Sequence, residues 1–410
     1  MTERAFTAPE TLAPSESGGA PAAPLMSRGF AVVLVTQAAF GYAFSSFFLL
    51  PKFLATELAV GPAEVGLLGA VSSVATVIGM FGAGAWVDRV GRRPLLSAGA
   101  LVMALSCVAF IAVEEMGPLV YLLRLLQSLA FALVYVAGAA LTVDRTPPER
   151  LGQALGYFGL TMLSMNAVAP AMVEELAATR GWAWAFASAG LAALICLALS
   201  RCISEPPRRA STGEGNAGMA EVSLRPAALR AGLVMLLVGA AFSTMFTYYQ
   251  LFALELGIEE LWVFFVAYSA AAMFVRLALG GLGDRWGRRR LSVAILLVYA
   301  FSVLAMTELA RIGLAPIAAL FGIAHGLFYP AYSALAAEET PARDRGKVLA
   351  LLQAWFNAGV AGSCYGLGVL AEARGYPVIF VVSAVCVFAA WGVVCFSPWA
   401  SRILRSNRGM

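Results

Sequence analysis

GAWVDRVGRR at residues 84–93 returns as GGLGDRWGRR at residues 280–289, and this repeated stretch decides the fold. Both copies hold a glycine, an Asp-Arg pair, a second glycine and two arginines, and they stand 196 residues apart. Two more pairs are displaced by 194 residues, Thr146-Pro147 with Thr340-Pro341 and Arg180-Gly181-Trp182 with Arg374-Gly375-Tyr376. Self-similarity over this length indicates two related halves.

The composition around the repeat is that of an integral membrane protein. Of 410 residues, 60% are apolar and only 13% are charged, far from the balance of a globular protein. A membrane-spanning helix needs about 20 apolar residues. Segments of that kind are predicted at 28–55, 65–87, 94–114, 118–143, 151–176, 181–200, 228–256, 260–283, 290–311, 314–337, 346–372 and 376–398. We therefore predict an all-α membrane protein of twelve transmembrane helices in two pseudo-symmetric six-helix bundles.

The polar stretches set the predicted domain boundaries. Residues 1–27 are rich in Ala, Pro, Ser, Glu and Gly and lack the pattern of a signal peptide, so we expect a disordered tail. A six-helix bundle is predicted at 28–200, a polar linker at 201–227, a second bundle at 228–398 and a short tail at 399–410.

Basic residues predict the orientation. Most of the 28 Lys and Arg residues fall in the two tails, the linker and every second loop, whereas the alternate loops are acidic. Short loops rich in Lys and Arg stay in the cytoplasm. We expect both termini and the linker to be cytoplasmic, in a multi-pass protein of the inner or plasma membrane.

Several classes of function find no support in the sequence. The six cysteines form no C-x-x-C pair and there is one histidine, so we expect no metal site and no cofactor. No nucleotide-binding P-loop and no hydrolase motif is present, which argues against a primary pump and against an enzyme. The expected partners are a small-molecule substrate, protons as coupling ion and the lipid bilayer, without nucleic acid, for a monomeric protein.

The doubled D-R-x-G-R-R turn resembles the signature of the major facilitator superfamily, over the whole predicted membrane region. The resemblance implies transport by alternating access, with the turns acting as a gate. Asp88 would face the start of the helix near Gly346, and Asp284 the start of the helix near Gly152. Arg92 would pair with Asp144, and Arg288 or Arg289 with Glu338 or Glu339. These contacts would latch the cytoplasmic side and break when it opens. The implied gating residues are Gly84, Asp88, Arg89, Gly91, Arg92, Asp144, Gly280, Asp284, Arg285, Gly287 and Arg288.

A second, partial resemblance concerns drug/proton antiporters of the superfamily. Arg124-x-x-Gln127-Ser128 is similar to their R-x-x-Q-G pattern, with serine in place of the glycine. Ala169-Pro170 stands where exporters of that group have a fuller glycine-rich motif. The resemblance favours export, although both motifs depart from the pattern of that group.

In this fold the first, fourth, seventh and tenth helices line the central cavity. Polar and aromatic side chains there, with one amide on the eleventh helix, are the predicted cavity residues. They are Gln37, Phe44, Arg124, Tyr135, Thr244, Tyr248, His325, Tyr329 and Asn357. An intramembrane arginine is costly unless it faces water or a partner, so Arg124 is expected to bind an anion or a proton-carrying group.

Four residues are candidates for proton coupling, namely Arg124, Glu175, Glu255 and His325. The leading hypothesis is a secondary transporter that exports an amphipathic compound in exchange for protons. The alternative is proton-linked uptake or exchange of a small organic anion, with Arg124 and Arg276 as counter-charges.

Overall fold

The computed structural model describes residues 27–205, 219–341 and 344–396, and within them all regular secondary structure is helical. The predicted tails and the middle of the linker lie outside these residues. The first half contains α1 (Arg28–Ser45), η1 (Ser46–Leu49), α2 (Leu50–Thr56), α3 (Pro62–Val90), α4 (Arg92–Ala109), η2 (Phe110–Ala112), α5 (Pro118–Asp144), η3 (Pro148–Arg150), α6 (Leu151–Arg180) and α7 (Trp182–Ser200).

The second half repeats this order after a short helix at the end of the linker, which was not predicted. It contains α8 (Met219–Ser223), α9 (Pro226–Ser243), the π-helical η4 (Thr244–Tyr248), α10 (Tyr249–Glu255), α11 (Trp262–Leu279), α12 (Leu282–Trp286), α13 (Arg288–Leu304), η5 (Ala305–Glu308), α14 (Leu309–Ile312), α15 (Leu314–Glu338), α16 (Arg345–Arg374) and α17 (Tyr376–Phe396).

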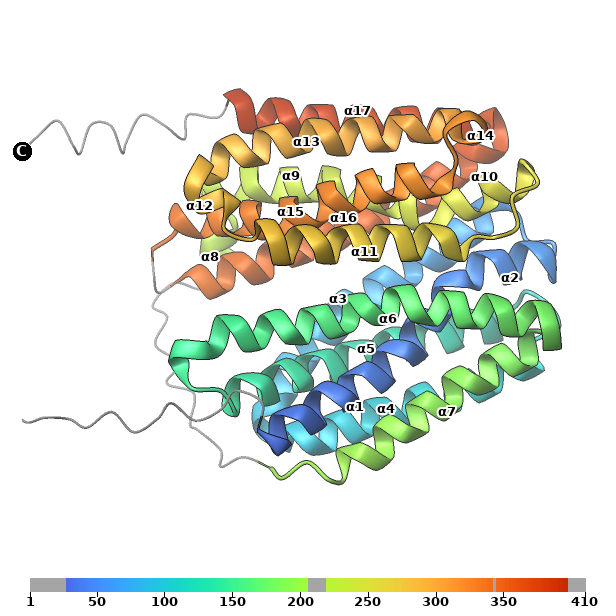
Figure 1. The fold of residues 1–410 in the computed structure, drawn as a ribbon, viewed down its shortest axis with the longest axis horizontal. Helices are drawn as coiled ribbons and strands as arrows, with labels where there is room; N and C mark the ends of the chain where they lie inside the picture. The colour runs from blue at the N-terminus through green and yellow to red at the C-terminus, as the bar shows by residue number, and fades with distance from the viewer. Residues whose placement is uncertain (1–26, 206–218, 342–343, 397–410) are drawn as a thin grey trace, which may run out of the picture.

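Twelve long helical segments therefore run along the described part of the chain, each within a few residues of its predicted range (Figure 1). Ten of them are long and apolar enough to cross a membrane. The other two, α6 and α16, have 30 residues each, which gives about 45 Å of helix, but they are more polar. Both lie at the contact between the halves, where polar side chains meet protein instead of lipid.

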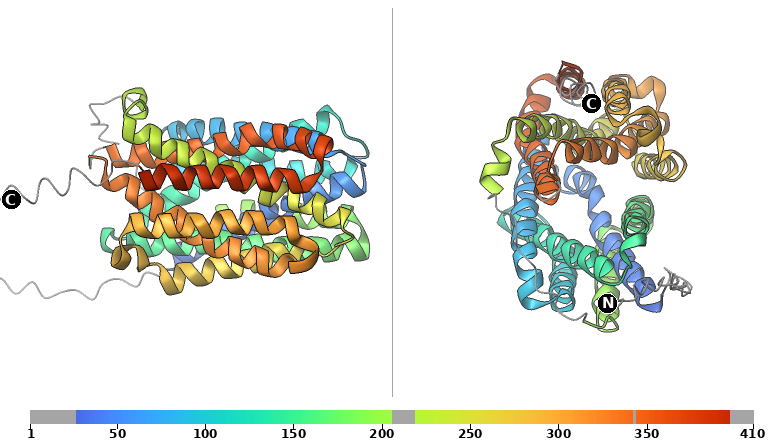
Figure 2. Two further views of the ribbon diagram at one scale, coloured as in Figure 1. Left: turned by 90° about the horizontal axis from the view of Figure 1, so that it is seen from above. Right: turned by 90° about the vertical axis from the view of Figure 1, so that its left-hand side faces the viewer.

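The halves are two bundles that lie side by side (Figures 1 and 2). Each has its own buried core, one made almost wholly of residues 33–203 and the other mainly of residues 222–394. Two helix pairs join them, with α3 packed on α16 and α6 packed on α11. The same pair of positions in each half thus makes the contact, as the internal repeat predicts.

Glycines of the repeat form the sharp turns between helices. Gly91 and Gly287 follow α3 and α12 with φ angles of +109° and +87°. Gly181 and Gly375 have φ angles of +90° and +82°. Only glycine adopts such angles without strain, so these four positions need it.

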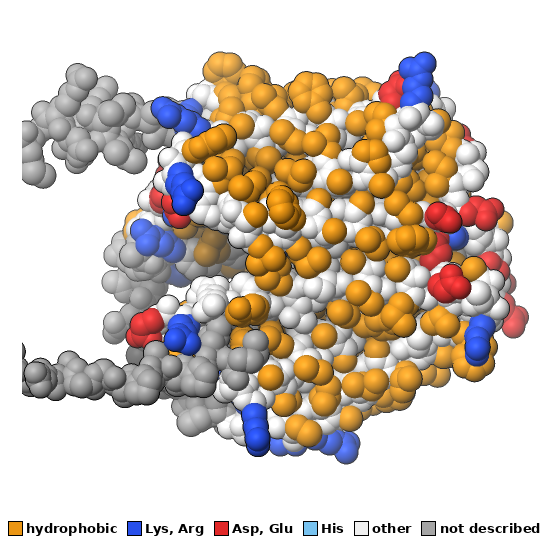
Figure 3. Space-filling view, in the orientation of Figure 1, with side chains coloured by type: hydrophobic (Ala, Val, Ile, Leu, Met, Phe, Trp, Pro, Cys, Tyr) orange, Lys and Arg blue, Asp and Glu red, His pale blue; other side chains and the backbone are white. Residues whose placement is uncertain are grey.

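The bundle has two chemically different ends, and Figure 3 shows both. The basic end carries the arginine-rich turns at residues 89–93 and 285–290, and the described chain begins and ends there. The acidic end carries Glu174, Glu259 and Glu372. The candidate functional residues lie at these two ends and on the helices that connect them.

Candidate functional site

At the basic end, the predicted ion pair within the first half is present. The Arg92 Nε atom, at the start of α4, lies 3.0 Å from an Asp144 carboxylate oxygen at the end of α5. The Arg92 side chain is 10% exposed and the Asp144 side chain 19%, so water screens the pair only in part. This contact fastens α4 to α5 inside the first bundle.

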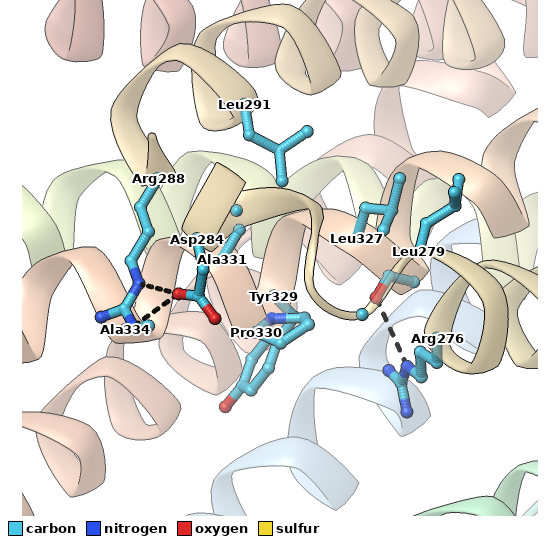
Figure 4. Close-up of a pocket in the computed structure, with 13 residues that line it drawn as sticks. Arg276, Leu279, Asp284, Arg288, Leu291, Leu327, Tyr329, Pro330, Ala331 and Ala334 are labelled. Carbon is cyan, nitrogen blue, oxygen red and sulfur yellow. Dashed lines mark hydrogen bonds and ion pairs between the residues drawn. The ribbon is translucent and has the colours of Figure 1, made fainter. Parts of the chain in front are cut away.

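The equivalent turn of the second half has a similar arrangement. Arg288 Nη2 lies 2.9 Å from Asp284 Oδ1 (Figure 4). Its Nη1 atom lies 2.8 Å from Glu338 Oε1 on α15. Arg289 instead donates to the backbone oxygens of Val394 and Cys395 at the end of α17. All these bonds stay within one half. The latch expected between the halves when the cytoplasmic side is closed stays a prediction.

Asp284 does not make the contact predicted for it across the halves. Its carboxylate accepts from Arg288 in the next turn of chain and remains 70% exposed. A Cβ atom placed on Gly152 or on Gly346 would have no neighbour within 4 Å, so the starts of α6 and α16 stand open. The halves are parted at this end, and Figure 3 shows the recess between them.

The remaining predicted gating residues are Arg89, Arg285, Gly84, Gly280 and Asp88. Arg89 and Arg285 are exposed. An added Cβ on Gly84 would meet nothing, whereas one on Gly280 would lie 2.7 Å from the Arg276 backbone oxygen. The side chain of Asp88 lies outside the described part, so its predicted role is kept as a prediction.

The acidic end holds the halves together, through a buried carboxylate. Glu174, near the end of α6, is 7% exposed. Its carboxylate oxygens accept from the backbone N–H groups of Leu261, at 3.1 Å, and Trp262, at 2.6 Å, where α11 of the other half begins. Lys52 Nζ lies 2.5 Å from Glu174 Oε1 and also donates to the Glu259 backbone oxygen at 2.7 Å. We call these residues the acidic-end latch.

A second carboxylate makes a related contact on the other seam. Glu372, near the end of α16, accepts from the backbone N–H of Ala63 in the first turn of α3 at 3.1 Å. Each seam therefore joins a carboxylate at the end of one helix to the positive N-terminus of a helix in the other half. The pseudo-symmetry of the fold therefore includes the contacts that close the acidic end.

Arg124 lies beneath the latch, in a cavity of about 160 Å³ between the halves. Its Nη1 atom donates to Gln127 Oε1 at 2.7 Å, and its guanidinium sits 5.9 Å from the centre of the Phe47 ring. Phe246 and Thr247 of the other half complete the lining of the cavity. The Arg124 Nε atom is buried without a partner, and no ion pair among the described residues includes this arginine. A buried cation of this kind attracts an anion.

A row of aromatic rings leads along α5 from this cavity toward the basic end. Phe44 stacks on Phe131 with ring centres 4.3 Å apart, and Phe131, Tyr135 and Phe158 follow at 5.4 and 5.5 Å. Tyr135 is 37% exposed. Such a row offers flat apolar surface to a molecule that moves between the bundles.

Two predicted cavity residues of the seventh helix are instead buried in helix contacts. Thr244 bonds to Ser383 Oγ at 2.6 Å, and the Tyr248 hydroxyl donates to the Cys364 backbone oxygen. Both are 0% exposed. Phe246 and Thr247, within the π-helical turn at Thr244–Tyr248, line the cavity instead. An α-helical periodicity does not reveal that turn.

His325 is packed rather than accessible. It is 8% exposed, its ring centre lies 4.9 Å from that of Phe242, and its Nδ1 atom has no partner among the described residues. Tyr329, one turn further, donates to Gln353 Oε1 on α16, and Asn357 Nδ2 bonds to the Gln353 backbone oxygen. Tyr329 and Asn357 thus lie around Gln353, between α15 and α16.

Arg276 is the second intramembrane arginine, on the basic-end side of α11. It lines a cavity of about 410 Å³ together with Tyr329, Asp284 and Arg288 (Figure 4). Its Nε atom is 3.4 Å from the Gly326 backbone oxygen, a weak contact. None of the ion pairs formed by the described residues includes it.

The other predicted residues are less central. Gln37 is 1% exposed and donates to Met162 Sδ at 2.9 Å, with its Oε1 atom unpartnered. Glu175 and Glu255 are both exposed at the acidic end. The sequence analysis did not predict the burial of Glu174, because the charge pattern alone does not tell it from the neighbouring exposed Glu175.

Comparison with known proteins decides the family. The pattern of the Major Facilitator Superfamily matches residues 31–282 and 261–407. The chain belongs to this superfamily. It is therefore a membrane transporter rather than an enzyme, in agreement with the interpretation of the repeated turns.

Relatives with assigned roles are distant. The chain is 29% identical over 269 residues to a probable 4-methylmuconolactone transporter of Cupriavidus pinatubonensis, and this match covers 61% of the chain and only 62% of that relative. It is 25% identical over 349 residues to the multi-drug resistance efflux pump PmrA of Streptococcus pneumoniae, covering 81% and 86%. It is 26% identical over 340 residues to the multidrug resistance protein MdtG of Dickeya zeae, covering 79% and 81%.

Solved structures share the fold. The nucleoside transporter NupG superposes with a TM-score of 0.73 at 11% identity, covering 90% of this chain and 99% of that one. An inward-facing bacterial homologue of the lysosomal transporter Spinster superposes with a TM-score of 0.75 at 15% identity, covering 91% and 97%. At these identities the likeness concerns the fold alone.

Proposed function

We propose that this transporter moves a small organic anion with an apolar or aromatic body by alternating access. The observation that carries the proposal is Arg124, a buried guanidinium without an ion-pair partner in the described chain, at the end of an aromatic row between the halves. A buried unpaired cation costs several kcal/mol unless a ligand or water neutralises it.

A second intramembrane arginine supports the same substrate class. Arg276 also lacks an ion-pair partner among the described residues, and it stands on the other half, nearer the basic end. An anion that passes between the bundles would meet one arginine near each end of its path. A cationic substrate would be repelled by both.

We also propose that the basic end is cytoplasmic, as the distribution of arginines predicts. The structure is then open toward the cytoplasm and closed at the acidic end by Glu174 and Glu372. Breaking that closure while the basic end closes would expose the Arg124 cavity to the other side.

We further propose that Glu174, and not Glu175 or Glu255, takes up the coupled proton. Protonation would remove the charge that Lys52 and two backbone N–H groups bind, and so release the two halves from each other. The exposed Glu175 and Glu255 hold no contact of this kind to release. A proton taken up at Glu174 would thus be linked to opening.

The test uses the purified protein in proteoliposomes loaded with a small aromatic carboxylate. We expect exchange of the carboxylate, no exchange of its neutral methyl ester, and loss of exchange in Arg124→Gln. Arg311→Gln, an exposed arginine at the acidic end, is the matched control and should transport normally. Equal transport of acid and ester, or full activity of Arg124→Gln, would refute the anion assignment.

A second candidate is proton-linked export of an amphipathic compound, favoured by the efflux pumps that match about four fifths of the chain. A pH jump across the same proteoliposomes separates the candidates. Export of a neutral or cationic amphipathic dye, driven by the pH gradient and insensitive to Arg124→Gln, would support this second function.

A further inference from the structure

The arginine-rich turn of the second half borders a second groove, next to the Arg276 cavity. The groove has a volume of about 1080 Å³ and lies at the basic end, around the start of α13. Four arginines and the exposed Trp286 line its rim, and apolar side chains of α13 line its floor. These residues are Arg285, Arg288, Arg289 and Arg290 on the rim, with Val293, Ala294 and Leu297 on the floor. Asp284 and Glu338 also line the groove, and both are paired with Arg288.

Two of the rim arginines keep their charge unneutralised. Arg288 binds Asp284 and Glu338, and Arg289 binds the carbonyl end of α17. Arg285 and Arg290 are exposed, and no carboxylate of the described residues pairs with either. The groove therefore combines free positive charge with an apolar floor.

The first half shows what occupies the equivalent place there. Glu205, just after α7, accepts from the backbone N–H groups of Arg92 at 2.7 Å and Arg93 at 2.9 Å. A carboxylate thus sits against the arginine turn of the first half. In the second half the residue after α17 at the same offset is Ser401, and residues 397–410 contain no Asp or Glu. The chain itself supplies no carboxylate side chain from that segment.

We propose that an anionic phospholipid occupies this groove. Its phosphate would lie between Arg285 and Arg290, and one acyl chain would follow the apolar floor formed by Ala294 and Leu297. Basic recesses between helices at a membrane surface suit anionic headgroups, and an exposed Trp at the same level suits the interface. The lipid would supply to the second half the negative charge that Glu205 supplies to the first.

The charge and the shape of the groove point to a lipid over a soluble anion. A free phosphate would use the rim and leave the floor uncovered. Ala294 is exposed, and Leu297 half-buried, on the side of α13 that faces outward from the bundle. A lipid covers both surfaces at once, which is the reason for the choice.

The experiment measures thermal unfolding of the full chain in detergent micelles. Phosphatidylglycerol is added at rising mole fraction, with phosphatidylcholine and inorganic phosphate as comparisons. A ligand that binds the folded state raises the unfolding midpoint. We expect phosphatidylglycerol alone to raise it. In the double variant Arg285→Gln/Arg290→Gln the required lipid concentration should rise about 30-fold, the effect of two charges near an anionic surface.

Arg311→Gln/Arg374→Gln is the matched control, since both arginines are exposed at the acidic end, and it should respond as the unaltered protein does. Ala294→Trp keeps the charges and fills the acyl floor, so it should weaken the response even if the double variant fails to fold. An unchanged response in the double variant or in Ala294→Trp would overturn the proposal. Equal stabilisation by inorganic phosphate would show a free-anion site instead.

Discussion

Replacing Glu174 by glutamine tests the acidic-end latch most directly. The carboxylate receives two backbone N–H bonds from the other half, at 3.1 and 2.6 Å, and a lysine bond at 2.5 Å. Glutamine has nearly the same shape, but it offers one acceptor oxygen and turns an NH₂ group toward a donor. The substitution therefore removes one bond across the seam and weakens the other.

The magnitude follows from the two bonds across the seam. A hydrogen bond to a charged group contributes about 1.5–3 kcal/mol, and a neutral one about 1 kcal/mol. Losing one charged bond and reducing the second to a neutral bond costs about 3 kcal/mol. Since 1.4 kcal/mol is a factor of ten, the ratio of closed to open acidic ends should fall about 100-fold.

The assay is a distance measurement between spin labels at the acidic end. Labels are attached to Thr56→Cys and Glu260→Cys, two exposed positions on opposite halves, after removal of the native cysteines. We expect Glu174→Gln to add a population with a longer distance. Glu175→Gln is the control, because it removes an exposed carboxylate from the next position of α6. A distribution that does not change in Glu174→Gln, or that changes equally in Glu175→Gln, refutes the latch.

Three further predictions concern the cavity, the helix packing and the basic end. Arg124→Lys should retain charge but lose the planar donor set, so apparent substrate affinity should fall about tenfold in a transport assay. Gly359→Ala should lower the unfolding midpoint, because its Cβ would collide with the Leu236 backbone oxygen of α9, while Gly362→Ala, which meets nothing within 4 Å, should not. The hydrogen bond from Arg225 lowers the pKa of the Asp344 carboxyl below its ordinary value. The stability it contributes is present above pH about 4 and disappears as the pH falls through the lowered pKa. Asp344→Asn should therefore lower the midpoint at neutral pH and flatten its dependence on acid, measured by thermal scans at several pH values.

The sequence alone predicted the architecture to within a few residues. Apolar length sets the helices, and glycines at Gly91 and Gly287 set the turns, because both depend on local chemistry. The repeat at residues 84–93 and 280–289 predicted the two halves, and it predicted the Arg92–Asp144 pair through the family resemblance. The residues of this pair share one bundle, so their contact does not depend on how the halves are arranged.

Only the tertiary structure decided which residues meet across the halves. Glu174 and Glu175 are neighbours in sequence, yet one is buried against α11 and the other is exposed, because adjacent helical residues point about 100° apart. Thr244 and Tyr248 are buried by contacts with Ser383 and Cys364, which lie on other helices far along the chain. Contacts between halves depend on the relative position of two rigid bundles, which local patterns of charge and hydropathy do not encode.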